Sequence, residues 1–249
     1  MNPIKEVLEN IKMGLKEVKP KLTKDKKNMM YKIINPDIDT YVILGIKTVD
    51  IEKIAREVHL RLNPSFNQAK EVFKLLANTD VEEYKFAAFF FLNRYKKYFD
   101  ESIPDLFRKE YFPYCHTWSS CDSCCIRVIG PFLAKKQNQK LAQKTIDSWS
   151  LDESTWIKRA SMVILLKVIM VHKDFDEEYV FSNVNNMLKY SNENYIEKAI
   201  GWLLKTCSKY RPNSIIDYLN TNRQKLSRLI LRYASEKLSK ESRKALLQK

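Results

Sequence analysis

The stretch FNQAKEVFKLLANTDVEEYKFAAFFFLNRY (Phe66–Tyr95) decides the fold class of this chain. In its first half, apolar residues recur at spacings of three and four, which is the period of an amphipathic α-helix. In its second half, the run Phe86–Leu92 is apolar on every side, and such a helix belongs in the middle of a core. Residues 78–80 between the two halves are a short polar break typical of a tight turn. The stretch therefore predicts two neighbouring helices in one core.

The helical period continues outward in both directions. Further helices are predicted at residues 2–17, 50–61, 101–111, 119–129, 134–147, 153–170, 176–188, 192–209, 213–220 and 226–247. The run Tyr41–Leu44 is the one candidate strand, and it is too short to make a sheet. Lys19–Lys27 is expected to be an exposed, charged connection. Helices of this length joined by tight turns predict an all-α solenoid of antiparallel helix pairs.

The charge balance points to an acidic partner. The chain has 249 residues, with 44 Lys and Arg against 30 Asp and Glu, so its formal net charge is +14. Residues 201–249 alone hold twelve basic and three acidic side chains. Nucleic acid is the commonest partner of such a protein and an anionic membrane surface the second; a generally basic protein is the plain alternative. The four glycines stand far apart, so neither a dinucleotide fingerprint nor a P-loop is present.

Membrane and secretion signals are weak. No apolar run reaches the roughly 18–20 residues that span a bilayer, and the N-terminus lacks the apolar centre of a signal peptide. The five cysteines are odd in number and four of them lie between residues 115 and 125. This pattern favours a reduced, intracellular protein (cytoplasm or nucleoid/nucleus) that is not bound to a membrane.

The segment HTWSSCDSCC (His116–Cys125) contains a C-x-x-C spacing. A closed zinc site usually needs two such pairs, or one pair with further Cys or His ligands. Cysteines that act as small, buried apolar residues are therefore the favoured interpretation, with a metal site or a Cys–His nucleophile as the alternatives. The sequence predicts no metal and no cofactor.

Trp118 and Asp122 in that segment are four residues apart, so they project from the same face of a helix. A carboxylate close to a helix N-terminus is stabilised in its ionised form. The pair can be a chemical site, or it can be a buried tryptophan beside a capping aspartate.

The helix predicted at 153–170 carries Lys158, Arg159 and Lys167. A basic pair near a helix N-terminus is unfavourable for the helix dipole. A phosphate bound there would explain the placement, and a solvated surface is the alternative.

The helix predicted at 192–209 contains Gly201, which costs about 1 kcal/mol relative to alanine in a helix interior. Close packing or the close approach of a ligand would explain a glycine at this position. Trp202 shares a helix face with Lys198, and Gly201 shares one with Lys205.

Five segments in this order resemble the DNA alkylation repair family, the AlkD-type DNA glycosylases. These segments are LGIKTVDIEKIAR (Leu44–Arg56), VEEYKFAA (Val81–Ala88), WSSCD (Trp118–Asp122), WIKRASMV (Trp156–Val163) and YIEKAIGWLL (Tyr195–Leu204). The likeness is collinear over most of the chain, and KAIGW is its most specific element.

The resemblance implies a right-handed, HEAT-like solenoid with a concave basic cleft. It implies a single domain over residues 1–249, with N-terminal helices at 1–35 and the repeat array at 36–249. The family excises cationic N3- and N7-alkylated purines from duplex DNA without a metal or diffusible cofactor, and without the base flipping common among glycosylases. A monomer is expected.

Site residues follow from the same resemblance. The catalytic positions that it implies are Asp122, Trp118 and Trp202, and the DNA-binding positions that it implies are Arg159, Lys167 and Lys205. Lys158 and Lys198, singled out above from their places on the same two helices, are predicted to bind DNA as well. Two positions depart from the family pattern, because Ser119 stands where Asp is common and Glu52 where Arg is frequent. The connection Ile34–Tyr41 is also longer than usual. A noncatalytic DNA-binding protein of the same fold and a protein-binding repeat scaffold are therefore the alternative functions.

Overall fold

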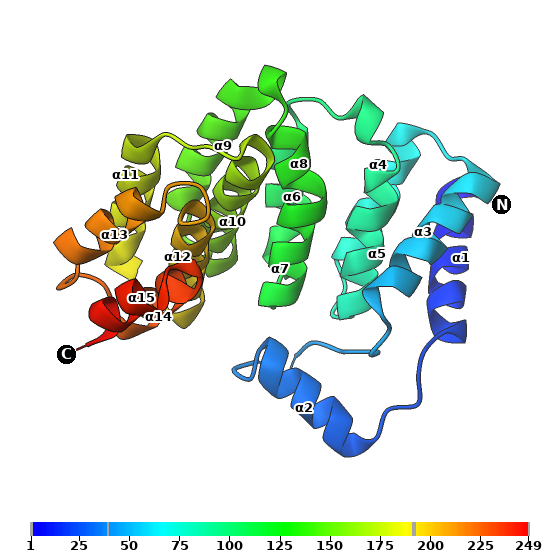
Figure 1. Ribbon diagram of the computed structural model, residues 1–249. Coiled ribbons are helices and arrows are strands. Elements are labelled where there is room, and N and C mark those ends of the chain that lie inside the picture. The colour runs from blue at the N-terminus through cyan, green and yellow to red at the C-terminus, as the bar shows by residue number, and fades with distance from the viewer. Residues whose placement is uncertain (1, 39, 191–192, 249) are drawn as a thin grey trace. The chain divides into compact units, whose positions relative to one another are not determined.

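The computed structural model describes residues 2–38, 40–190 and 193–248, and these residues are mostly helical (Figure 1). The α-helices are α1 (Pro3–Glu17), α2 (Lys24–Ile34), α3 (Thr48–Leu62), α4 (Phe66–Ala77), α5 (Glu82–Asn93), α6 (Ile103–Glu110), α7 (Trp118–Cys124), α8 (Gly130–Leu133), α9 (Gln139–Ser150), α10 (Thr155–His172), α11 (Glu177–Met187), α12 (Asn194–Cys207), α13 (Pro212–Thr221), α14 (Arg228–Ala234) and α15 (Lys240–Leu247). The candidate strand Tyr41–Leu44 makes only an isolated bridge between Val42 and Val81. The all-α prediction is confirmed.

The predicted connection Lys19–Lys27 is partly wrong, because α2 begins at Lys24. The Thr23 hydroxyl starts the helix by accepting the backbone N–H of Lys26 at 3.3 Å. The helix has no buried residue, so the apolar period that predicts other helices is missing here.

The predicted helix 226–247 is in fact two helices. α14 ends in a 3₁₀ turn at Ser235–Lys237, and α15 starts anew where the Ser239 hydroxyl accepts the N–H of Ser242 at 3.1 Å. A polar cap inside an apolar pattern is what interrupts the helix. Asn192, where another helix was predicted to begin, lies outside the described residues.

The chain divides into two compact units, Met1–Cys124 and Cys125–Lys249. In the first unit, α5 packs against α3 and α4, and α1 packs against α3 and α4. The apolar run Phe86–Leu92 on α5 is buried throughout, as predicted. Because α4 and α5 contact each other and a short turn at residues 78–81 joins them, the two helices are antiparallel.

Glu83 joins two of the segments that carry the family resemblance. Its buried carboxylate accepts the backbone N–H groups of Leu44 at 2.9 Å, Gly45 at 2.6 Å and Ile46 at 3.3 Å. Gly45 has a φ of +82°, and a Cβ there would lie 2.5 Å from the Cδ1 of Leu22. Glycine is therefore required at this position, and the loop before α3 is held on α5.

In the second unit, α10 is the central helix and packs against α9 and α12, while α12 packs against α14. The residues of α10 from Ile157 to Leu166 are all buried. A Cβ on Gly201 would lie 2.5 Å from the Cβ of Tyr233 and 3.3 Å from the carbonyl oxygen of Ile230. Close helix packing therefore explains this glycine.

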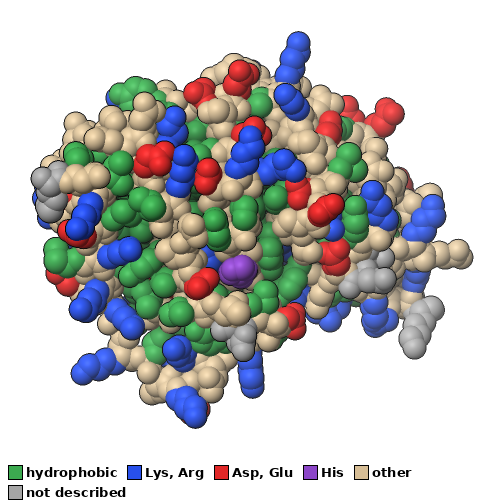
Figure 2. Space-filling view, turned by 180° about the vertical axis from the view of Figure 1, so that it is seen from behind, with side chains coloured by type: hydrophobic (Ala, Val, Ile, Leu, Met, Phe, Trp, Pro, Cys, Tyr) green, Lys and Arg blue, Asp and Glu red, His purple; other side chains and the backbone are tan. Residues whose placement is uncertain are grey.

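Side chains of both charges are mixed on one face of the molecule (Figure 2). Figure 2 shows Lys and Arg side chains among acidic and apolar ones on the face seen there. Among the described residues, no helix combines the length and the apolar character that crossing a bilayer requires.

Candidate active site

Helix α7 carries Trp118 and Asp122, and Thr117 starts it. The Thr117 hydroxyl accepts the N–H of Ser120 at 3.1 Å, which is the hydrogen bond of an N-cap residue. The capping position thus belongs to Thr117 rather than to Asp122. Asp122 is 8% exposed and lies one turn after Trp118, on the same face of the helix.

Trp118 is half-buried and is tied to the end of α2. Its indole N–H donates to the carbonyl oxygen of Ile33 at 3.0 Å. Beside it, the side-chain amide of Asn35 donates to the carbonyl oxygen of His116 at 2.6 Å. The last turn of α2 and the residue after it are therefore hydrogen-bonded to the start of α7 and the residue two positions before it.

A buried carboxylate lies under the start of α7. Glu82 of α5 is 4% exposed and accepts the Thr117 hydroxyl, whose oxygen is 2.9 Å from the hydroxyl oxygen of Ser120. Burial raises the pKa of Glu82, while the hydrogen bond from Thr117 and the charge of Lys85 lower it. The polar chain from Glu82 to Thr117 to Ser120 joins α5 to the first turn of α7.

Lys85 is the cation of the same buried region. It has no exposed surface, and burial lowers the pKa of its ammonium group. Within the described part of the chain, Glu82 Oε2 and Lys85 Nζ are both without a hydrogen-bond partner. The predicted site includes neither residue, although three charged residues (Glu82, Glu83 and Lys85) directly before the apolar run of α5 were a visible signal.

The residues directly after α7, Cys125–Ile129, form a π-helical turn. π-Helical turns are rare in proteins as a whole, but those that occur often lie at functional sites. A Cβ on Gly130 would lie 2.5 Å from the carbonyl oxygen of Cys125 and 2.6 Å from the Cγ of Lys167. The aliphatic stem of Lys167 therefore packs on the glycine that directly follows the turn.

In the second unit, Lys158 and Arg159 of α10 are both buried, at 4% and 5% exposure. The Lys158 ammonium lies 3.1 Å from the Glu193 carboxylate and 3.8 Å from the centre of the Tyr190 ring. The Arg159 guanidinium donates to the carbonyl oxygen of Tyr195 at 2.5 Å. Partners within the protein thus explain the position of Lys158 without a phosphate, so its DNA contact stays a prediction.

Helix α12 presents Trp202, Lys198 and Lys205, each partly exposed. The Lys198 ammonium lies 5.8 Å from the centre of the Tyr195 ring. The Lys205 ammonium lies 2.8 Å from the Glu236 carboxylate. Trp202 shares a helix face with Lys198 as predicted from their spacing, whereas Lys205 already has an anionic partner in the protein.

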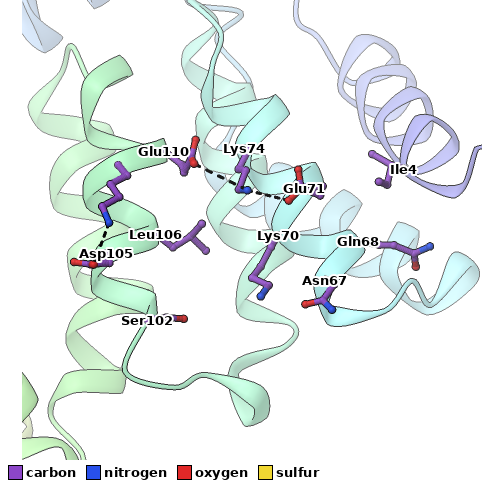
Figure 3. Close-up of a pocket in the computed structure, with 11 residues that line it drawn as sticks. Ile4, Asn67, Gln68, Lys70, Glu71, Lys74, Ser102, Asp105, Leu106 and Glu110 are labelled. Carbon is purple, nitrogen blue, oxygen red and sulfur yellow. Dashed lines mark hydrogen bonds and ion pairs between the residues drawn. The ribbon is translucent and has the colours of Figure 1, made fainter.

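A cavity of about 610 Å³ lies in the first unit between residues of α1, α4 and α6 (Figure 3). Lys74 faces Glu71 at 2.9 Å and Glu110 at 4.0 Å, and Lys109 faces Asp105 at 3.3 Å. Charges that neutralise each other in this way do not make an anion site. None of the predicted site residues lines this cavity.

The cysteines are free thiols, and each is buried. Burial raises the pKa of the Cys115 thiol well above its usual range and that of Cys207 to about 12. This agrees with their interpretation as small apolar core residues. In residues 2–38, 40–190 and 193–248, no three His, Cys, Asp or Glu side chains are grouped so that they could hold a metal ion.

These features define an all-α protein of packed helix pairs, with a buried aspartate one turn after a tryptophan. The family model of the DNA alkylation repair enzyme matches residues 15–238. Since that match covers most of the sequence, the chain belongs to the DNA alkylation repair enzyme family, as its motifs predicted.

A solved structure described as a predicted DNA alkylation repair enzyme from Enterococcus faecalis is similar to this chain. Its TM-score is 0.71 at 16% sequence identity, and the alignment covers 90% of this chain and 99% of that chain. At this identity, the similarity shows a shared fold. No curated protein matches the sequence.

Proposed function

We propose that this protein is a DNA glycosylase that releases N3- and N7-alkylated purines from duplex DNA. Membership of the DNA alkylation repair enzyme family supports DNA as the partner and repair as the process. The observation that carries the glycosylase proposal is the position of Asp122. It is a buried carboxylate one turn after Trp118 on α7, whose N-terminus is capped by Thr117.

The chemistry needs little more than an anion near the sugar. Alkylation at N3 or N7 gives the purine a positive charge, which makes it a good leaving group. When the N-glycosidic bond breaks, its electron pair leaves with the base, and positive charge develops on the deoxyribose. Water then adds to the sugar carbon and loses a proton.

Asp122 is the proposed anion. At about 4 Å and an effective dielectric constant near 20, opposite charges attract by about 4 kcal/mol. That energy corresponds to roughly a thousandfold in rate. It is enough for a labile glycosidic bond and too little for an unmodified one, so the lesion itself would supply much of the selectivity.

The other residues have supporting roles in the proposal. Trp118 and Trp202 would contact the deoxyribose and attract its developing charge through their π faces. Arg159 would bind a backbone phosphate with its planar guanidinium. Lys158, Lys167, Lys198 and Lys205 would add salt-sensitive affinity for the duplex.

A base-release assay tests this function. The Asp122→Asn protein should release 7-methylguanine and 3-methyladenine from methylated duplex DNA about two to three orders of magnitude more slowly than the parent protein. Its affinity for unmodified duplex should change little, because the removed charge is negative and does not bind phosphate.

The matched control is Asp105→Asn, which makes the same change on an exposed carboxylate of α6. Release at the parent rate by the Asp122→Asn protein would remove Asp122 from the mechanism. Duplex binding by the parent protein without any base release would favour the alternative function, a noncatalytic DNA-binding protein of the same fold. The departures from the family pattern at Ser119 and Glu52 are the reason for considering that alternative.

A further inference from the structure

Helix α2 is exposed along one face and has no fully buried residue. None of its residues from Lys24 to Ile34 is buried. Met29 is 55% exposed and Ile33 is 59% exposed, although both are large apolar side chains. Figure 1 shows α2 set apart from α1, α3 and α5 of the same unit. The helix therefore presents apolar surface that the first unit does not cover.

The helix is nevertheless held at both ends. Before it, the side chain of Leu22 lies directly over Gly45. In its last turns, the Tyr31 hydroxyl accepts the N–H of Ile43 at 3.2 Å, and the Tyr31 ring lies 5.2 Å from that of Tyr41. One face of α2 is thus fixed on the preceding and following segments, and the opposite face is presented outward.

The outward face combines apolar and basic side chains. Met29 and Ile33 are four residues apart and share this face. Lys26 and Lys32 lie on either side of this face together with Asp25, whereas Lys24 and Lys27 lie on the side of Tyr31, whose ring centre is 5.9 Å from the Lys27 ammonium. A partner that fits it must offer an apolar surface bordered by negative charges. The minor groove of duplex DNA has this character, because sugar walls line it and phosphates border it.

The position of the face agrees with this partner. Ile33 exposes its side chain and gives its backbone carbonyl to the indole N–H of Trp118. DNA that contacts Ile33 would therefore lie beside the residue proposed to touch the sugar of the damaged nucleotide.

We propose that α2 is a duplex-contacting element in which Met29 and Ile33 pack against the minor-groove sugars while Lys26 and Lys32 pair with the flanking phosphates. The choice of DNA rests on the proposed function, but the contact does not depend on base release.

The test measures binding of the full chain to an unmodified duplex by fluorescence anisotropy at several salt concentrations. Replacing both apolar residues, as in Met29→Gln with Ile33→Gln, should weaken binding about tenfold and leave the salt dependence unchanged. Replacing the lysines, as in Lys26→Gln with Lys32→Gln, should lower the slope of log K against log salt by about 2.

The matched control is Val49→Gln with Leu60→Gln, two apolar residues of α3 that are 66% and 67% exposed. This control should bind DNA as the parent does. Parent-like binding by the Met29/Ile33 variant would overturn the proposal. So would a loss of binding to anionic phospholipid vesicles in that variant with DNA affinity intact.

The two proposals can fail separately. If the parent binds duplex through α2 but releases no alkylated base, the glycosylase proposal fails and the α2 contact stands. If base release at saturating DNA is normal and the α2 variants bind normally, the α2 contact fails and the glycosylase proposal stands.

Discussion

Asp122 and Trp118 are the residues of α7 with a proposed chemical role, but the residue that supports them is Glu82. Its carboxylate accepts the hydroxyl of Thr117, which caps α7. Burial of such a carboxylate is costly unless hydrogen bonds and a nearby cation compensate. Here Thr117 and Lys85 supply part of that compensation.

The raised pKa of Glu82 predicts a pH-dependent stability. Burial raises this pKa above its ordinary value of 4.5. Between pH 4.5 and the pKa in the folded protein, Glu82 is therefore protonated in the folded protein and ionised in the unfolded chain. The contribution of Glu82 to stability is therefore complete below pH 4.5 and is lost as the pH rises through the folded pKa.

Glu82→Gln should remove this loss. Urea unfolding from pH 4 to pH 8 should show the variant gaining stability relative to the parent as the pH rises. The difference between the two proteins reports the titration of Glu82 together with its effect on Lys85, whose pKa the Glu82 charge raises. A stability difference that is constant with pH would show that Glu82 does not titrate in this range.

At the scale of the elements, the cap of α7 is the contact that positions the candidate site. Thr117→Val keeps the shape of the side chain but removes the hydroxyl that Ser120 and Glu82 both use. Loss of an N-cap costs about 1 kcal/mol, and an unpaired buried carboxylate adds to this cost. We expect a lower urea midpoint together with slower base release.

Thr23→Val is the control for that variant, since Thr23 caps α2 in the same way but in an exposed position. It should cost no more than the cap itself. Thr117→Ser keeps the hydroxyl and should restore most of the stability. If Thr117→Val lowers the stability no more than Thr23→Val does, the hydrogen bond from Thr117 to Glu82 contributes nothing to stability.

The packing of α12 on α14 gives a second prediction at this scale. Gly201→Ala should gain about 1 kcal/mol in helix propensity, yet the new Cβ would lie 2.5 Å from the Cβ of Tyr233. Overpacking of this kind typically costs about 1–3 kcal/mol, so we expect a lower midpoint of thermal unfolding. Gly14→Ala on α1 is the comparison, because the atoms nearest to its Cβ would belong to the Ile54 side chain, the first of them at 3.0 Å.

For the molecule as a whole, the +14 net charge predicts salt-sensitive affinity for duplex DNA. Arg159→Ala should lower the slope of log K against log salt by about 1 if the guanidinium binds one phosphate. Arg211→Ala is the control, because Asp174 at 2.5 Å and Glu177 at 3.0 Å already neutralise that arginine. An unchanged slope for Arg159→Ala would contradict the phosphate contact, and thermal unfolding of both variants checks that they fold.

The sequence by itself determined the fold class and the family. The helical period, the apolar run on α5 and the order of the motifs are local properties of the chain, so they can be predicted without coordinates. The spacing of Trp118 and Asp122 also placed them on one helix face. Their roles in catalysis stay predictions.

Only the tertiary structure decided which polar groups meet. Glu82 and Thr117 are 35 residues apart, and no local pattern predicts that a buried carboxylate accepts the cap of α7. The pairing of Lys158 with Glu193 is likewise invisible in the sequence, because it depends on how α12 packs against α10. The bounds of α2 were not predicted for a similar reason. Its residues lack an apolar stripe that faces a core, and its position is set by contacts of its ends with segments that are distant in the sequence.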